Sequence, residues 1–159
     1  MEPSVVYSQL KQVIALAEDK ISNLHRIRKD IDTLKNALMC LVSQKVHQEC
    51  CEELSLAHQE IQACCDLLDK FAGKSKKYFY GSMERYLRAY IDYLHCAKLA
   101  SKQRLEIQRA ILHFVTRSKT AKTTGHLKTM MNEMKSTQKM CQDKAVEVNR
   151  FAGQTKAQD

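Results

Sequence analysis

The sequence predicts an all-α protein, an up-and-down four-helix bundle with an additional helix at its C-terminal end. Its 159 residues include four glycines and one proline, too few to supply the turns of a sheet protein. The composition is rich in Leu, Ala, Lys, Glu, Gln and Met, which favour long helices. Apolar residues recur every three or four positions, which is the period of a helix that buries one face. A chain of this length is sufficient for one domain.

The first helical segment runs from Ser4 to Lys45 and follows a start signal at Pro3. Its apolar stripe consists of Leu10, Ile14, Ala17, Ile21, Leu24, Ile27, Ile31, Leu34, Leu38 and Leu41. No glycine or proline interrupts the stripe, so it fits a single helix about 60 Å long at about 1.5 Å per residue. It fits equally well two antiparallel helices that reverse at Ser22–Asn23 or near Lys29–Asp30. The pattern does not decide between these arrangements.

Two more helices are predicted in the middle of the chain. The second spans about residues 48–71 and ends at Gly73, a residue suited to a helix C-cap. The polar and basic stretch 73–82 then breaks the helical pattern. The third helix spans about residues 82–117, with Ser82 as a suitable N-cap. Residues 1–117 therefore form the predicted bundle.

The C-terminal part is predicted to hold one further helix behind a linker. Residues 118–125, with the sequence SKTAKTTG, lack large apolar side chains and form the predicted linker. The last helix covers about residues 126–153, carries a stripe rich in methionine and closes at Gly153. Residues 154–159 are predicted to be a disordered tail.

The charge is divided unevenly along the chain. Residues 47–72 contain six acids and one base, whereas residues 73–123 contain twelve bases and three acids. Such an asymmetry indicates an electrostatic face and a polyanionic partner. The basic block consists of Lys74, Lys76, Lys77, Arg85, Arg88, Lys98, Lys102, Arg104, Arg109, Arg117, Lys119 and Lys122.

Three interpretations of the basic block compete. It can be a solvated face that the acidic helix neutralises in part. It can bind an anionic membrane, where each Lys or Arg contributes about 1 kcal/mol. Nucleic acid would use the same charges through counterion release, but no base-reading motif, zinc finger or aromatic platform accompanies them. We therefore expect anionic membrane lipid and no nucleic acid.

The sequence also predicts a reduced, cytoplasmic protein. Residues 1–10 lack the basic start and apolar core of a signal peptide. The longest apolar run, residues 37–42, is far shorter than the roughly 20 residues that span a bilayer. The seven cysteines include the adjacent pairs Cys50–Cys51 and Cys64–Cys65, so we expect free thiols that pack in the interior.

No motif predicts catalysis, a metal site or a cofactor. The best metal candidate combines His47 with Cys50 or Cys51, but no fourth ligand is suitably spaced, and buried thiols beside a surface histidine are the favoured interpretation. His95 and Cys96 are neighbours, so on a helix they point about 100° apart. No Gly-rich phosphate loop or nucleophile motif is present.

Two groups of aromatic residues have different expected roles. Tyr86, Tyr90 and Tyr93 follow helical spacing beside apolar residues, which favours a place at the border of the core. Residues 78–80, Tyr-Phe-Tyr, lie instead in the basic stretch between two helices. They can cap the end of the bundle or form an exposed anchor.

Three features resemble the N-terminal helical-bundle domain of the mixed lineage kinase domain-like protein family. The start, Leu10–Lys11–x–x–Ile14–x–Leu16, is similar to that family's opening amphipathic helix. Glu60–Ile61 leads, after nine residues, into Lys70–Phe71–Ala72–Gly73–Lys74–Ser75, with Phe79 and Gly81–Ser82 behind, which looks like the family's helix end and basic turn. The order of bundle, linker and last helix is also similar, which would make the last helix brace-like.

The resemblance implies a cytoplasmic executioner domain of necroptosis-like cell death. Such a domain binds phosphoinositide-rich membranes on activation, oligomerises and permeabilises them, and a regulatory kinase or pseudokinase is an expected partner. The residues that would take the lipid role are Arg26, Arg28 and Lys29 near the possible first turn, and Lys74, Lys76 and Lys77 in the loop. Arg85 and Arg88 continue the basic block onto the next helix.

We therefore predict a non-enzymatic, membrane-targeting bundle that binds anionic phospholipids and associates with itself. The alternative is a helical adaptor or coiled-coil subunit that pairs its long helices with another protein. The two are distinguished by whether the stripe of the first segment is satisfied inside the bundle.

Overall fold

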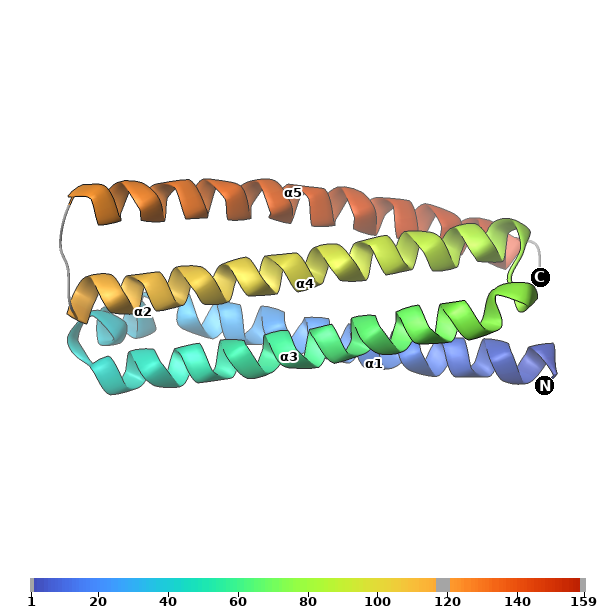
Figure 1. Cartoon of the computed structure of the whole chain (residues 1–159), viewed down its shortest axis with the longest axis horizontal. Helices are drawn as coiled ribbons and strands as arrows, with labels where there is room; N and C mark the ends of the chain where they lie inside the picture. Colours follow the sequence, from blue (N-terminus) through green and yellow to red (C-terminus); the bar gives the residue numbers. More distant parts are fainter. Residues whose placement is uncertain (1, 117–120, 158–159) are drawn as a thin grey trace.

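The computed structural model describes residues 2–116 and 121–157. Four long helices run alternately in opposite directions (Figure 1): α1 (Pro3–Ile31), α3 (Gln44–Ser75), α4 (Gly81–Thr116) and α5 (Ala121–Ala157). A short helix, α2 (Leu34–Val42), joins α1 to α3, and a 3-10 turn, η1 (Lys76–Tyr78), joins α3 to α4. The described residues contain no strand, and the predicted all-α bundle is confirmed. The C-terminal helix, predicted as an addition to four, is the fourth long helix.

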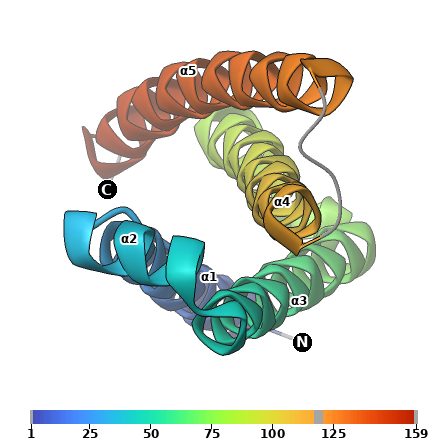
Figure 2. The ribbon, with the colours of Figure 1, turned by 90° about the vertical axis from the view of Figure 1, so that its left-hand side faces the viewer.

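The helices pack mainly in chain order. The principal contacts join α1 to α3, α3 to α4, and α4 to α5. Viewed along the bundle, α4 lies between α3 and α5, whereas α5 stands away from α1 and α2 (Figure 2). The α3–α4 turn, the start of α1 and the end of α5 lie at one end of the bundle, and α2, the end of α4 and the start of α5 lie at the other (Figure 1).

The apolar stripes of α1, α3 and α4 meet in one core. Its most deeply buried side chains, each with at most 3% of the side chain's surface exposed, include Val6, Leu10, Leu24, Leu54, Ile61, Leu68, Tyr90 and Leu94. From α5, Val148 and the partly buried Phe151 join this core. The stripe of the first segment is thus buried within the chain along α1.

The first segment breaks at Asp32–Thr33, just beyond the second of the two predicted reversals. The Thr33 hydroxyl accepts a hydrogen bond from the Asn36 amide (3.3 Å) and donates one to the Asp30 carbonyl (2.9 Å). Ser43 caps α3 in the same way, accepting from the Val46 amide at 3.4 Å. Both hydroxyls satisfy helix-end amides that have no partner within the helix, which is why new helices start here.

Several predicted helix boundaries were wrong. Helix α3 begins at Gln44, about four residues before its predicted start and inside the predicted first segment, and it continues through Gly73 to Ser75. Helix α5 begins at Ala121 inside the predicted linker and continues past Gly153 to Ala157. A helical glycine costs only about 1 kcal/mol relative to alanine, so single glycines do not end these long helices. Residues 118–120 of the predicted linker and 158–159 of the predicted tail lie outside the described residues.

Candidate functional site

The candidate site is the end of the bundle formed by the turn from α3 to α4. We call residues 70–88 the hairpin tip; they contain six bases, Lys70, Lys74, Lys76, Lys77, Arg85 and Arg88, and one acid, Glu84. All six basic side chains are exposed. Because the turn is short, cations from two helices and the loop are held at one end of the molecule (Figure 1).

One aromatic residue fixes the turn to the bundle. Phe79 is 5% exposed and packs edge-to-face on Tyr7 of α1, with ring centroids 5.7 Å apart, and against Phe71 of α3 at 6.0 Å. The Tyr7 hydroxyl donates to the Tyr78 carbonyl at 3.4 Å. These contacts hold the backbone of the tip in a defined position.

The neighbouring tyrosine has the opposite environment. Tyr80 is 77% exposed and lies among the cations of the tip. Phe79 therefore caps the core, whereas Tyr80 faces solvent, and an anchoring role for Tyr80 stays a prediction. A tyrosine in such a position is suited to the interface between water and a lipid headgroup layer.

The tip cations are largely free of carboxylate partners. Arg88 pairs with Glu84 one turn earlier, with nitrogen and oxygen 2.9 Å apart, and Lys77 lies over the Tyr78 ring at 5.1 Å. Within the described part of the chain, Lys70, Lys74, Lys76 and Arg85 make no ion pair. Their charge is therefore available to a partner.

The acidic face of α3 makes no ion pair with the described side chains of the basic block, which do not include that of Lys122. Of these described basic side chains, only Arg88 and Arg104 make ion pairs, and neither partner lies on α3. The α3 carboxylates of Glu60 and Asp69 pair instead with Lys20 (3.5 Å) and His95 (3.0 Å). Arg117 and Lys119 of the block lie outside the described residues.

The structure separates the predicted lipid-binding residues into two groups. Lys74, Lys76, Lys77, Arg85 and Arg88 share the tip. Arg26, Arg28 and Lys29 lie near the other end of α1, about 20 residues beyond Tyr7, which is about 30 Å along a helix. Arg26 is engaged locally, with Asn23 at 2.7 Å and Asp30 at 3.7 Å. Arg28 and Lys29 line a groove between helices.

Lys70 was not among the predicted lipid-binding residues, because it belongs to the acidic segment of residues 47–72. It follows Asp69 in the last turns of α3 and is exposed beside Lys74 on the tip. Its spacing of four residues from Lys74 on a helix was the available signal.

The predicted tyrosine row is confirmed. Tyr90 is 2% exposed, with its hydroxyl donating to a Glu18 carboxylate oxygen at 2.6 Å. The Tyr86 and Tyr93 rings lie 6.3 Å and 5.8 Å from the Tyr90 ring and are partly buried. These aromatics support the core.

The prediction of a surface histidine at position 47 was wrong. His47 is fully buried, and its Nε2 atom lies 2.9 Å from the carbonyl oxygen of Gln108 on α4. The reason is the start of α3 at Gln44, which turns His47 toward α4.

A second histidine lies beside a hydroxyl group, with His58 Nδ1 2.7 Å from Ser101 Oγ. Ser101 is fully buried and donates to the Lys98 carbonyl, so a substrate cannot reach this pair.

Comparisons with protein families, with curated proteins and with solved structures give no match to this chain. Within the described residues, each helix is too short or too polar to cross a bilayer.

Proposed function

We propose that this protein is a non-enzymatic helical bundle that binds anionic phospholipid surfaces through the hairpin tip. The observation that carries the proposal is the exposed, largely unpaired set of cations that shares the hairpin tip with the exposed Tyr80.

The charge of the tip accounts for weak, reversible binding. Near an anionic membrane each unpaired Lys or Arg contributes about 1 kcal/mol, so the five bases other than Arg88 contribute about 5 kcal/mol. This corresponds to a dissociation constant on the order of 10⁻⁴ M. Tyr80 adds an apolar, interfacial contribution that salt does not screen.

Self-association would raise the affinity without new contacts. Two tips held in one assembly bind the same membrane at a high effective concentration, which strengthens the overall binding about 100-fold or more. We propose, from the family resemblance, that such assembly is the step at which a bound bundle disturbs a membrane. Phosphoinositide headgroups, with several negative charges each, are the favoured lipid class.

Sedimentation with vesicles tests the proposal. The full chain should pellet with phosphatidylcholine vesicles that contain phosphatidylinositol bisphosphate, and not with phosphatidylcholine alone. Replacing Lys74, Lys76 and Lys77 together by Glu should abolish pelleting, because the tip then becomes acidic. Tyr80→Ser should weaken binding even at high salt.

A matched variant controls for net charge. Lys35, Lys45 and Lys128 are exposed and lie on α2, at the start of α3 and early in α5, at the end opposite the tip. Replacing these three by Glu changes the charge equally but should leave vesicle binding intact. Equal loss in both triple variants would show that net charge, and not the tip, attracts the vesicles.

The second candidate function is that of a helical adaptor, which exposed apolar residues on α2 favour. Leu38 and Val42 are 54% and 81% exposed, and Met39 beside them is 39% exposed. Contiguous exposed apolar residues mark protein contacts more often than isolated ones do. An adaptor without lipid affinity would show no pelleting in either vesicle set.

A further inference from the structure

A groove runs along the seam between α1 and α5, with α4 as its floor. It consists of two adjoining chambers of about 670 Å³ and about 570 Å³, which share Arg28, Asp32 and Gln138. Volumes of this size are typical of sites for small organic ligands, about 300–1,000 Å³. The groove is separate from the hairpin tip, because none of its lining residues belongs to residues 70–88.

Small side chains leave the groove open. Ala97 and Ala100 of α4 face it one turn apart, and Ala145 lines it from α5. On α1 the opposite wall is formed by the larger Ile21 and Leu24. Alanines at the places where a closed bundle would carry larger residues leave an apolar channel between the helices.

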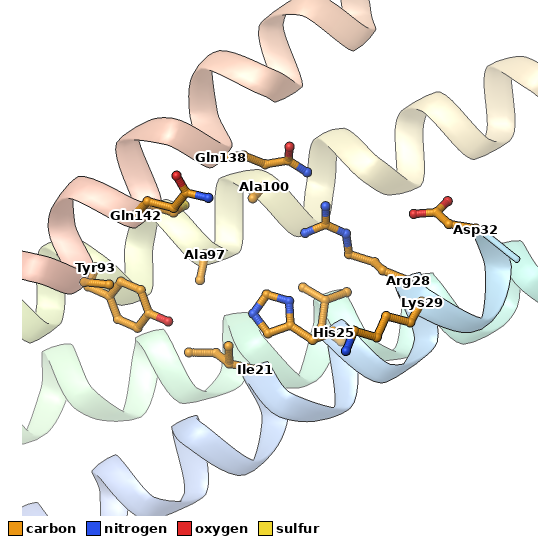
Figure 3. Close-up of a pocket in the computed structure, with 13 residues that line it drawn as sticks. Ile21, His25, Arg28, Lys29, Asp32, Tyr93, Ala97, Ala100, Gln138 and Gln142 are labelled. Carbon is orange, nitrogen blue, oxygen red and sulfur yellow. The ribbon is translucent and has the colours of Figure 1, made fainter.

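Among the described cations that line the groove, Arg28 is the half-buried one without a partner, whereas Lys29 and Lys135 are exposed and Arg104 is paired. The Arg28 side chain is half-buried and reaches from α1 across the opening toward α4 and α5 (Figure 3). Within the described part of the chain it makes no hydrogen bond or ion pair. The nearby carboxylate, Asp32, is already bound to Arg104 at 2.7 Å.

Desolvation makes the unpaired guanidinium costly. Burial, followed by the charge of Arg104, lowers the pKa of Arg28, although the group stays charged. An unpaired charge in a partly desolvated site costs free energy, which an incoming anion recovers. His25 contributes no cation at neutral pH, since desolvation, then Arg28 and Lys29, lower its pKa.

We propose that this groove binds a long-chain fatty-acid carboxylate, with its head on Arg28 and its chain along the apolar seam. The Gln138 side chain lies beside the opening and can donate to the second carboxylate oxygen (Figure 3). The chain lies over Ile21, Leu24, Ala97 and Ala100 or extends into the second chamber, beside Ile107 and Met134.

The shape and chemistry of the lining favour a carboxylate that carries a hydrocarbon chain. Arg28 and Gln138 lie at the opening and can each donate to one of the two oxygens of a single carboxylate. The apolar walls also require a hydrocarbon chain, because a small anion alone would leave them in contact with water.

Calorimetric titration of the full chain with dodecanoate, below its micelle concentration, tests the head of the site. One molecule should bind per chain, and Arg28→Gln should weaken binding about tenfold to a hundredfold, since a charge-assisted hydrogen bond is lost. Arg26→Gln is the matched control: Arg26 is exposed two residues away and does not line the groove, so its loss should leave binding unchanged. Equal affinity of wild type and Arg28→Gln would overturn the proposal.

The chain requirement is tested on the same protein. Ala145→Leu should fill the first chamber and weaken dodecanoate binding, whereas Ala63→Leu, on an exposed part of α3, should not. Acetate, which has the carboxylate but no long chain, should not compete with dodecanoate. Competition by acetate would contradict the assignment.

Vesicle binding at the hairpin tip and fatty-acid binding in the groove can be tested independently of each other. The variant with Lys74, Lys76 and Lys77 changed to Glu should lose vesicle binding and keep dodecanoate binding. Loss of dodecanoate binding in that variant would place the fatty acid at the tip and overturn the groove site.

Discussion

The cysteine thiols are enclosed by the packing of the helices. All seven are free, and Cys40, Cys51, Cys64, Cys65 and Cys96 are buried. Cys65 donates to the Leu94 carbonyl at 3.5 Å, and burial raises its pKa to about 11. A thiol that stays protonated reacts slowly with alkylating agents, because the thiolate is the nucleophile. These side chains therefore serve as small apolar packing groups.

The raised pKa predicts a loss of stability at alkaline pH. An unfolded cysteine titrates near pH 8.5, whereas Cys65 titrates at about 11 in the folded protein. Between these values the unfolded state holds fewer protons, so its free energy falls relative to the folded state as pH rises. The effect is absent below about pH 8 and should reach on the order of 1 kcal/mol at pH 10 for this one group.

Urea unfolding of reduced protein at pH 7 and pH 10 measures this effect. The wild type should lose more unfolding free energy between the two values than Cys65→Ala, which lacks the titrating group. Because tyrosines titrate in the same range, the difference between the two proteins is the informative quantity. Identical losses would mean that the Cys65 thiol ionises as easily in the folded state as in the unfolded one.

Two glycines lie near the turn from α3 to α4, and the backbone conformation of the turn requires Gly81 but not Gly73. Gly81 begins α4 with φ of +61°, in the left-handed region that residues with a Cβ atom adopt at a cost. Gly73 lies in α3 without a positive φ, and a Cβ atom placed on either residue would meet no atom within 4 Å. The two positions therefore differ in backbone conformation and not in available space.

Substituting each glycine by alanine should change stability in opposite directions. Gly81→Ala should destabilise the fold by about 1 kcal/mol through backbone strain, while Gly73→Ala should stabilise it by about 0.5–1 kcal/mol through better helix propensity. Midpoints of urea unfolding, compared with wild type, measure both. Destabilisation by Gly73→Ala would indicate that α3 ends at this residue, as the sequence had suggested.

A chain of buried polar contacts connects three helices across the molecule. Arg104 of α4 binds Asp32 at the end of α1 at 2.7 Å and Gln108 at 3.0 Å. The Gln108 side chain in turn lies 2.9 Å from Nε2 of His47 on α3. The Arg104 side chain is only 9% exposed, so its charge depends on this set of partners.

Removing the carboxylate should destabilise the whole bundle. Asp32→Ala leaves Arg104 buried without its charged partner and should cost about 1–2 kcal/mol, less than for a fully buried pair because Asp32 itself is open to water. Asp30→Ala removes an exposed pair with Arg26 and should change stability by less than about 0.5 kcal/mol. Chemical denaturation of both variants at neutral pH makes the comparison, and equal effects would show that Arg104 is adequately solvated.

Long periodic segments were predictable, and their ends were less so. The stripe of α1 and the tyrosine row of α4 follow helical spacing over many turns, so many residues report the same face. A helix end depends on one or two residues, and Gly73 and Gly153 were each compatible with a C-cap or a helix interior. The caps Thr33 and Ser43 are residues of the right type, but such residues also occur within helices.

The cationic tip was predictable in part, and the groove was not. Lys74, Lys76 and Lys77 are close in sequence, so any fold would hold them together. Arg28 acquires its significance from Ala97 of α4 and Gln138 of α5, which are distant in the chain and individually ordinary. No spacing along one helix reveals a surface that three helices share.

The sequence by itself determined the helical class, the buried stripes and the strong positive charge of the middle third, because these depend on local periodicity and composition. Only the tertiary structure decided that Phe79 turns inward while Tyr80 turns outward, and that Arg26, Arg28 and Lys29 lie far from the tip. The physical reason is that burial and ion pairing depend on which helices pass side by side. That choice is made by packing between segments far apart in the chain.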